Sequence, residues 1–141
     1  MKQIFIDTWG WINLFNRTEH HHQQVSQLYR DIRKASVGIV TTDYVLDEVY
    51  TMLFKRVLFE KAQVAVETLW QAIKDGYVTL EWITPERFEA SQTFRLKFQD
   101  KPDISFTDLT SMVVMQELGI VEIITGDAHF MHVGMGFSLQ P

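Results

Sequence analysis

Two aspartates in this sequence stand where an acid is hard to explain as ordinary surface. Asp7 ends the apolar run Ile4 to Ile6, and Asp127 follows Ile123 and Ile124 in "IITGDAHF". A charge buried without a partner costs several kcal/mol, so a carboxylate at the end of a buried strand needs a cation or a proton. Two strands that both end in this way indicate one shared site.

Helical periodicity turns two further acids toward the interior. Glu48 lies three residues after Val45 and four before Met52, at the edge of the apolar stripe of its helix, whereas its neighbour Asp47 faces the opposite way. Asp108 shares a helix face with the two methionines that follow it in "SFTDLTSMVVMQELG". We therefore expect Glu48 and Asp108 to join the two strand-end aspartates.

Each of these acids also has a purely structural interpretation, and these interpretations stay open. Ser105 to Asp108 fits a capping box, in which the acid bonds back to the cap residue. Asp127 lies in a sequence typical of a turn, and Glu48 is compatible with an ordinary helix-edge acid. Asp7 alone would suggest a buried basic partner, but the predicted buried stripes contain none.

Four carboxylates in one place favour a metal site. Two like charges about 4 Å apart repel by about 4 kcal/mol at an effective dielectric constant near 20, so such a cluster must hold protons or bind cations. The chain has no cysteine and no well-placed histidine pair. Oxygen ligands alone select hard cations such as Mg²⁺ or Mn²⁺, and a site of this kind points to phosphoryl chemistry.

The elements that must position these acids alternate between strand and helix. Buried strands are predicted at 2–6, 37–40 and 121–124, and strands nearer an edge at 78–83 and 137–139. Helices are predicted at 10–16, 20–34, 43–57, 60–74, 85–98 and 106–118. The alternation predicts an α/β fold, a three-layer α/β/α sandwich with a mainly parallel central sheet, whose working site lies at the carboxyl ends of the strands.

Length and composition indicate one ordinary globular domain spanning 1–141. No apolar run approaches the roughly 20 residues that span a bilayer, no secretory pattern opens the chain, and the absence of cysteine fits a reducing compartment, so a cytoplasmic location is expected. The net charge of −5 argues against a general nucleic-acid binder. Two basic clusters could nevertheless flank a groove for a phosphate backbone: Lys55, Arg56 and Lys61, and Arg95, Lys97 and Lys101.

The order and context of the four acids resemble the four acidic motifs of the PIN-domain ribonucleases, and in particular the VapC-type toxins of prokaryotic toxin-antitoxin pairs. The resemblance covers essentially the whole chain. It implies a compact α/β/α sandwich that binds Mg²⁺ or Mn²⁺ and cleaves RNA endonucleolytically. It further implies that Asp7, Glu48 and Asp108 are the core metal ligands and catalytic residues, and that Asp127 holds or completes a second metal site.

Residues beside these motifs have supporting roles in the same resemblance. Thr8 and Thr107 match hydroxyls found next to the acids, and Thr125 to Phe130 matches the family ending T-x-D-x-x-F. The tryptophans at 9 and 11 are bulkier than the family's usual residues, and either pack a short helix or offer stacking surfaces to bases. Asp103 is an extra acid, for which capping of the helix is preferred over a contact to a metal ligand.

The resemblance implies that the chain is the toxin of a toxin-antitoxin pair, with an RNA substrate, a cognate antitoxin protein whose segment blocks the acidic site, and a homodimeric assembly. Two other functions remain as alternatives. One is a PIN-like module that binds RNA or protein without catalysis. The other is a metal-dependent phosphatase with an aspartate nucleophile, which usually has a second acid two residues later, where this chain has Trp9.

Overall fold

The computed structural model describes residues 2–141 and contains a five-stranded sheet with helices on both sides. The strands are β1 (Gln3–Ile6), β2 (Gly38–Thr42), β3 (Val78–Glu81), β4 (Glu122–Ile124) and β5 (Ser138–Gln140). The helices are α1 (Thr8–Phe15), α2 (His22–Lys34), α3 (Asp43–Arg56), α4 (Phe59–Lys74), α5 (Pro85–Lys97), α6 (Phe106–Leu118) and α7 (His129–His132). Across residues 2–141, no helix combines the length and apolarity needed to cross a bilayer.

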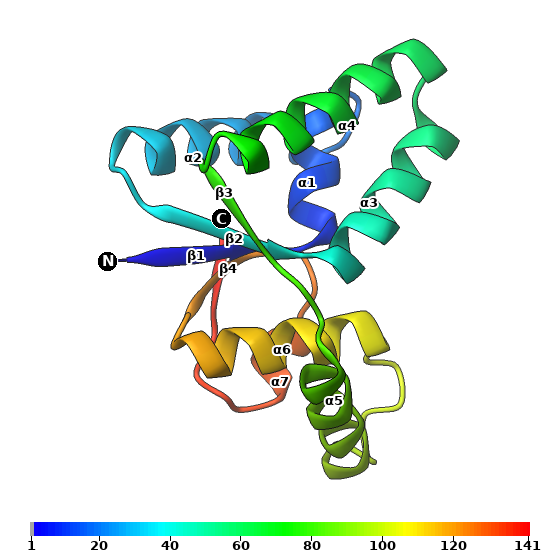
Figure 1. The fold of residues 1–141 in the computed structure, drawn as a ribbon, viewed down its shortest axis with the longest axis vertical. Coiled ribbons are helices and arrows are strands. Elements are labelled where there is room, and N and C mark those ends of the chain that lie inside the picture. Colours follow the sequence, from blue (N-terminus) through cyan, green and yellow to red (C-terminus); the bar gives the residue numbers. More distant parts are fainter. Residues whose placement is uncertain (1) are drawn as a thin grey trace.

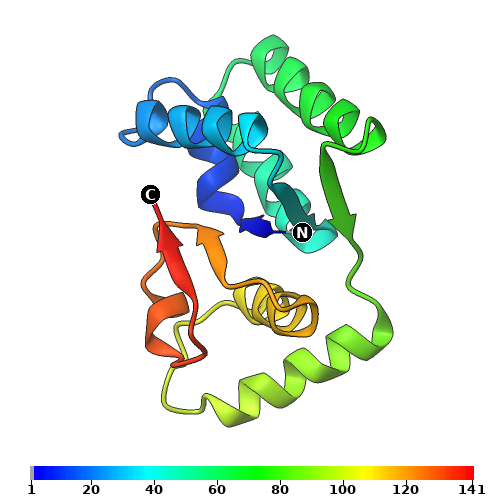
Figure 2. The same cartoon turned by 90° about the vertical axis from the view of Figure 1, so that its left-hand side faces the viewer.

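The sheet has the strand order β3-β2-β1-β4-β5, and every adjacent pair is parallel. Helices α1 to α4 cover one face, and α5 to α7 cover the other (Figures 1 and 2). This arrangement confirms the predicted three-layer α/β/α sandwich. The two strands predicted nearer an edge, β3 and β5, are the edge strands.

The direction of chain progression reverses at the centre of the sheet. From β1 the chain adds β2 and β3 on one side, then returns past β1 to add β4 and β5 on the other. Since parallel crossovers are right-handed, the reversal changes the face on which the connecting helices pack, as Figure 1 shows. In open α/β sheets the crevice at such a reversal, beyond the carboxyl ends of the strands, is the usual binding site. Here it lies between β1 and β4, next to Asp7 and Asp127.

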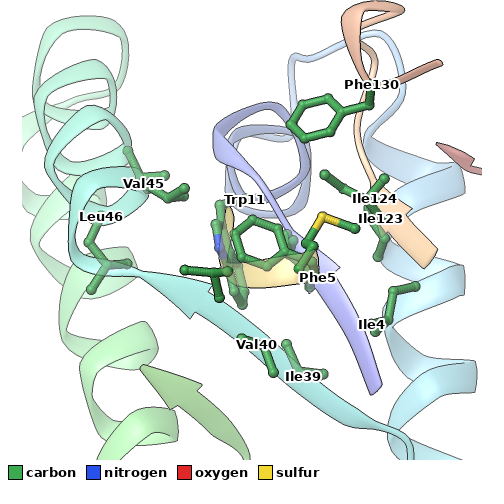
Figure 3. Packing of buried hydrophobic residues seen from close by; sticks show 14 of the residues in the cluster. Ile4, Phe5, Trp11, Ile39, Val40, Val45, Leu46, Ile123, Ile124 and Phe130 are labelled. Atoms are coloured by element: carbon green, nitrogen blue, oxygen red, sulfur yellow. The ribbon is translucent and has the colours of Figure 1, made fainter. Parts of the chain in front are cut away.

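Trp11 fixes the first helix against the sheet. Its side chain is fully buried among residues of β1, β2 and β4, as Figure 3 shows. The indole Nε1 donates a hydrogen bond to Thr41 Oγ1 at 3.1 Å, and the ring stacks on Phe15 with centroids 6.1 Å apart. Trp11 is therefore a packing residue, the first of the two interpretations given above.

The element ends differ from the predicted ones for local reasons. Helix α1 begins at Thr8 rather than at residue 10 because the Asp7 side chain caps it, accepting a hydrogen bond from Gly10 N–H at 3.1 Å. Helix α2 begins at His22 rather than at residue 20 because the chain turns there, and His21 N–H donates to Asn13 Oδ1 at 3.1 Å. The four-residue helix α7 was not predicted.

Gly10 offers a test of how closely α1 approaches the sheet. A Cβ at this position would lie 2.6 Å from Ile6 Cγ2 and 3.0 Å from the Ile124 carbonyl oxygen. Helix propensity alone predicts that Gly10→Ala stabilises the protein by about 1 kcal/mol. We expect the opposite, a loss of about 1 to 3 kcal/mol in the free energy of unfolding measured with urea, because the added methyl overpacks the contact. Thr51→Ala, at an exposed position of α3, is the control and should stay within about 0.5 kcal/mol of the parent; a stabilised Gly10→Ala would contradict the packing.

Candidate active site

A pocket of about 430 Å³ opens at the carboxyl end of the sheet and is lined by all four acids identified from the sequence. Thr8 and Asp103 also line it, whereas Thr107 is not among its lining residues. The hydroxyl residue near Asp108 that lines the pocket is instead Ser105, the N-cap residue of α6. The full lining is Asp7, Thr8, Trp9, Ile12, Asn13, Glu19, Glu48, Met52, Arg56, Asp103, Ser105, Asp108 and Asp127.

Asp7 is buried and held on both carboxylate oxygens. One oxygen accepts the Gly10 N–H bond that caps α1, and the other accepts a hydrogen bond from Thr125 Oγ1, on the turn after β4. Burial raises the pKa of Asp7 to about 7; these two hydrogen bonds offset only part of that effect, and the charges of Asp127 and Glu48 raise it further. The Asp7 side chain is therefore held in place, but its two hydrogen bonds do not offset the cost of burying its negative charge.

Asp108 lies in the first turn of α6, where Ser105 is the N-cap and accepts a hydrogen bond from Asp108 N–H at 3.0 Å. The reciprocal bond of a capping box, from Ser105 N–H to the Asp108 carboxylate, is not among the hydrogen bonds of residues 2–141. The carboxylate instead faces Asp127. Burial raises the pKa of Asp108 well above its ordinary range, and the hydrogen bond and repulsion from Asp127 raise it further, with smaller contributions from Asp7 and Glu48.

Glu48 reaches the pocket from the edge of α3, as its helical position predicts. Its Oε1 accepts a hydrogen bond from Thr8 Oγ1 at 2.7 Å. This bond joins the start of α1 to the middle of α3, because Thr8 opens α1 and Glu48 lies in the middle of α3. Thr8 thus orients an acid of the pocket.

Asp103 does not cap α6, which corrects the preferred interpretation given above, since Ser105 is the N-cap residue. Asp103 is exposed at the pocket rim. The loop that carries it is held by Arg95, whose guanidinium donates to the carbonyls of Ile104, Phe98 and Lys101 at 2.7, 2.8 and 2.6 Å. Arg95 is therefore engaged in holding this loop in front of α6, rather than free to meet a phosphate backbone.

Trp9, unlike Trp11, borders the pocket. Its ring centroid lies 5.2 Å from that of His21, and its indole lies against Gly126, where a Cβ would clash with the ring. Gly126 directly follows Thr125, the partner of Asp7. The half-buried Trp9 ring therefore forms a wall of the pocket next to the buried aspartate.

Three residues outside the predicted set of acids contact acids of the site. Arg56, named above in a basic cluster that could flank a groove, is the only basic side chain in the pocket lining, and its Nη1 lies 3.5 Å from Glu19 Oε1. Thr125 was noted only as part of the terminal motif, although it bonds Asp7 directly. His129 has its Nδ1 3.0 Å from Asp127 Oδ1 and 4.0 Å from Asp108 Oδ2. No local periodicity marks these residues, since their partners are distant in sequence or lie in a turn.

The donor set suits a divalent cation. Six acids and one arginine line the pocket, and oxygen atoms of Asp108 and Asp127 with a nitrogen of His129 lie within 4.8 Å of one another. Among the described residues, no basic side chain offsets the raised pKa values of Asp7 and Asp108. A bound cation would supply a positive charge and lower these pKa values.

The fold and pocket together define an acidic α/β sandwich of the PIN type. The sequence matches the family model of the PIN domain over residues 4–135, and the chain belongs to this family. It is similar in structure to Mycobacterium tuberculosis VapC20, a sarcin-ricin loop cleaving toxin, with 29% sequence identity, a TM-score of 0.77, and coverage of 94% of this chain and 95% of VapC20. No curated protein sequence gives a significant match.

Two further solved structures share the fold at low identity. VapBC2 from Rickettsia felis, bound to a DNA fragment from its promoter, has 13% identity, a TM-score of 0.73, and coverage of 97% of this chain and 96% of the other. DNA-bound VapBC from Salmonella typhimurium has 12% identity, a TM-score of 0.67, and coverage of 99% and 98%. The resemblance to VapC-type proteins that the four motifs suggest is thus confirmed at the level of fold and family.

The raised pKa values of Asp7 and Asp108 predict an inverted dependence of stability on pH. Between about pH 4 and pH 7 the folded protein binds more protons than the unfolded chain, so the free energy of unfolding falls as pH rises. In EDTA we expect a loss of about 1 to 3 kcal/mol between pH 5 and pH 8, measured by urea unfolding. Added Mn²⁺ should restore stability at pH 8 and have little effect at pH 5, since ligands must be deprotonated.

Two variants separate the effect of the buried acids from the titration of exposed acids elsewhere on the protein. Asp108→Asn should flatten the decline, because it removes one of the retained protons. Asp47→Asn, an exposed neighbour of Glu48 on α3, should leave the slope unchanged. A metal-free protein that is more stable at pH 8 than at pH 5 would contradict the assignment of the buried, protonated acids.

Proposed function

We propose that this chain is a Mg²⁺- or Mn²⁺-dependent endoribonuclease in which Asp7, Glu48, Asp108 and Asp127 form the active site. The observation that carries the proposal is the convergence of these four acids in one pocket at the reversal point of a parallel sheet. Membership of the PIN family and likeness to VapC20, a toxin that cleaves the sarcin-ricin loop, support RNA as the substrate class.

The chain's own residues divide the work within the pocket. Asp7 offers a carboxylate fixed by Gly10 and Thr125, and Thr8 orients Glu48 by a hydrogen bond. Asp108 and Asp127 form the acidic pair on the α6 side. A bound divalent cation supplies activation of water and neutralisation of the charge that develops on the phosphate. The rigid framework keeps these groups in place without reorganisation during the reaction.

We further propose that the chain acts in the cytoplasm, as a single domain spanning 1–141, and is the toxin of a toxin-antitoxin pair. The VapBC complexes of similar fold support an antitoxin protein as partner. A homodimer is proposed from the family resemblance alone. A segment of the antitoxin partner could block the acidic pocket by binding in it.

Asp7→Asn tests the proposed activity. Asparagine keeps an oxygen that can cap α1, so the fold should persist while one negative ligand is lost. Cleavage of an RNA oligonucleotide carrying a sarcin-ricin-type loop, in Mg²⁺ or Mn²⁺, should fall by about 100-fold or more, on the scale of removing one electrostatic group from an active site. Asp47→Asn is the matched control and should cleave like the parent; unchanged cleavage by Asp7→Asn would refute the active site.

Arg56 is the pocket's candidate contact for a substrate phosphate, because its side chain is half exposed and held only by Glu19. Arg56→Ala in an Asp7→Asn background should weaken RNA binding, measured by fluorescence anisotropy. The slope of log affinity against log salt should fall by about 0.7, the value for one phosphate contact with a single strand. Lys55→Ala, the adjacent exposed residue outside the pocket, should change neither quantity by as much, and equal effects of the two variants would argue against a specific contact.

A further inference from the structure

His129 places a nitrogen atom in the acidic pair of the pocket without giving it an ordinary role. Its Nδ1 has no accessible surface and makes no hydrogen bond, although it lies 3.0 Å from Asp127 Oδ1. The same nitrogen lies 4.0 Å from Asp108 Oδ2. A buried ring nitrogen of histidine normally has a hydrogen-bond partner, and this atom has none among the described residues. A ligand bound in the site is a candidate for that partner.

The backbone determines where this nitrogen points. His129 N–H donates to Asp127 Oδ1 at 2.9 Å, and Asp127 N–H donates to Thr125 Oγ1 at 3.0 Å. Thr125 in turn bonds the buried Asp7. The turn between β4 and α7 is thus tied to the floor of the pocket, and the imidazole is presented beside the two aspartates, while part of its ring remains exposed.

The spacing of the three donor atoms matches one cation. With metal–ligand distances of about 2.1 to 2.2 Å, adjacent ligands of an octahedral ion lie about 3.0 Å apart and opposite ligands about 4.3 Å apart. The separation of 3.0 Å between Nδ1 and Asp127 Oδ1 equals the adjacent-ligand distance, the separation of 4.0 Å to Asp108 Oδ2 lies between the adjacent and opposite distances, and all three atoms lie within 4.8 Å of one another. The geometry therefore accommodates an ion between His129, Asp108 and Asp127.

We propose that His129 Nδ1 is a direct ligand of the divalent cation, together with Asp108 and Asp127, and that it gives this site a preference for Mn²⁺ over Mg²⁺. Mg²⁺ is bound by oxygen and retains its water, whereas imidazole nitrogen suits the transition metals. This inference rests on the proposed function for the existence of a cation site, and adds the identity of a ligand and the metal it selects.

Pulsed electron paramagnetic resonance on the Mn²⁺-loaded protein tests the proposal without an activity assay, because it detects nitrogen bound to Mn²⁺. The parent protein should show ¹⁴N coupling. His129→Ala and His129→Gln should lose it, and His132→Ala, an exposed histidine one turn along α7, should retain it. Calorimetry should show Mn²⁺ affinity reduced about 10-fold or more in both His129 variants, with Mg²⁺ affinity changed less than about 2-fold.

The outcomes separate this inference from the proposed function. Mn²⁺ binding without ¹⁴N coupling in the parent, or equal losses of Mn²⁺ and Mg²⁺ affinity in the His129 variants, would overturn the ligand assignment and leave the nuclease proposal standing. In that case His129 would be an ion-pair partner of Asp127 only. A parent protein that binds neither metal would overturn both.

Discussion

The repulsion among carboxylates held at the end of an apolar strand is the constraint on which the rest of this site depends. Asp7 is buried because β1 is apolar on both faces, and the same burial raises its pKa to about 7. The other acids approach from α3, α6 and the turn after β4. Hydrogen bonds from Thr8 and Thr125 fix the carboxylates of Glu48 and Asp7. They do not neutralise the negative charge of the cluster, which a cation can do.

The sheet topology explains why these acids meet although they are distant in sequence. The reversal between β1 and β4 leaves a crevice at the carboxyl ends of the strands, and the pocket there is lined by residues of α1, α3, α6 and the turn after β4. Trp11 and Trp9, two residues apart in α1, then take opposite roles. Trp11 packs the helix onto the sheet through its bond to Thr41, and Trp9 stands at the wall of the pocket against Gly126. One short helix therefore both closes the core and shapes access to the site.

Most of the fold, and the meeting of the four acids in one pocket, could be predicted from the sequence because each followed from a local pattern. Uninterrupted apolar runs marked the buried strands, and helical phase distinguished Glu48 from Asp47. Features without a local sequence pattern were not predicted. Helix α7 has only four residues and no periodicity, and the bond between Thr125 and Asp7 joins residues 118 positions apart. Capping was the preferred role for Asp103, whereas in the structure Ser105 is the N-cap residue of α6 and Arg95 holds the loop that carries Asp103.

Anomalous X-ray diffraction from crystals soaked in Mn²⁺ would reveal whether the acidic pocket binds a cation. We expect an anomalous peak in the pocket within about 2.2 Å of carboxylate oxygens of Asp108 and Asp127. We also expect this peak to disappear in Asp108→Asn crystals. Well-ordered crystals of the parent protein with no anomalous peak in this pocket at millimolar Mn²⁺ would contradict it.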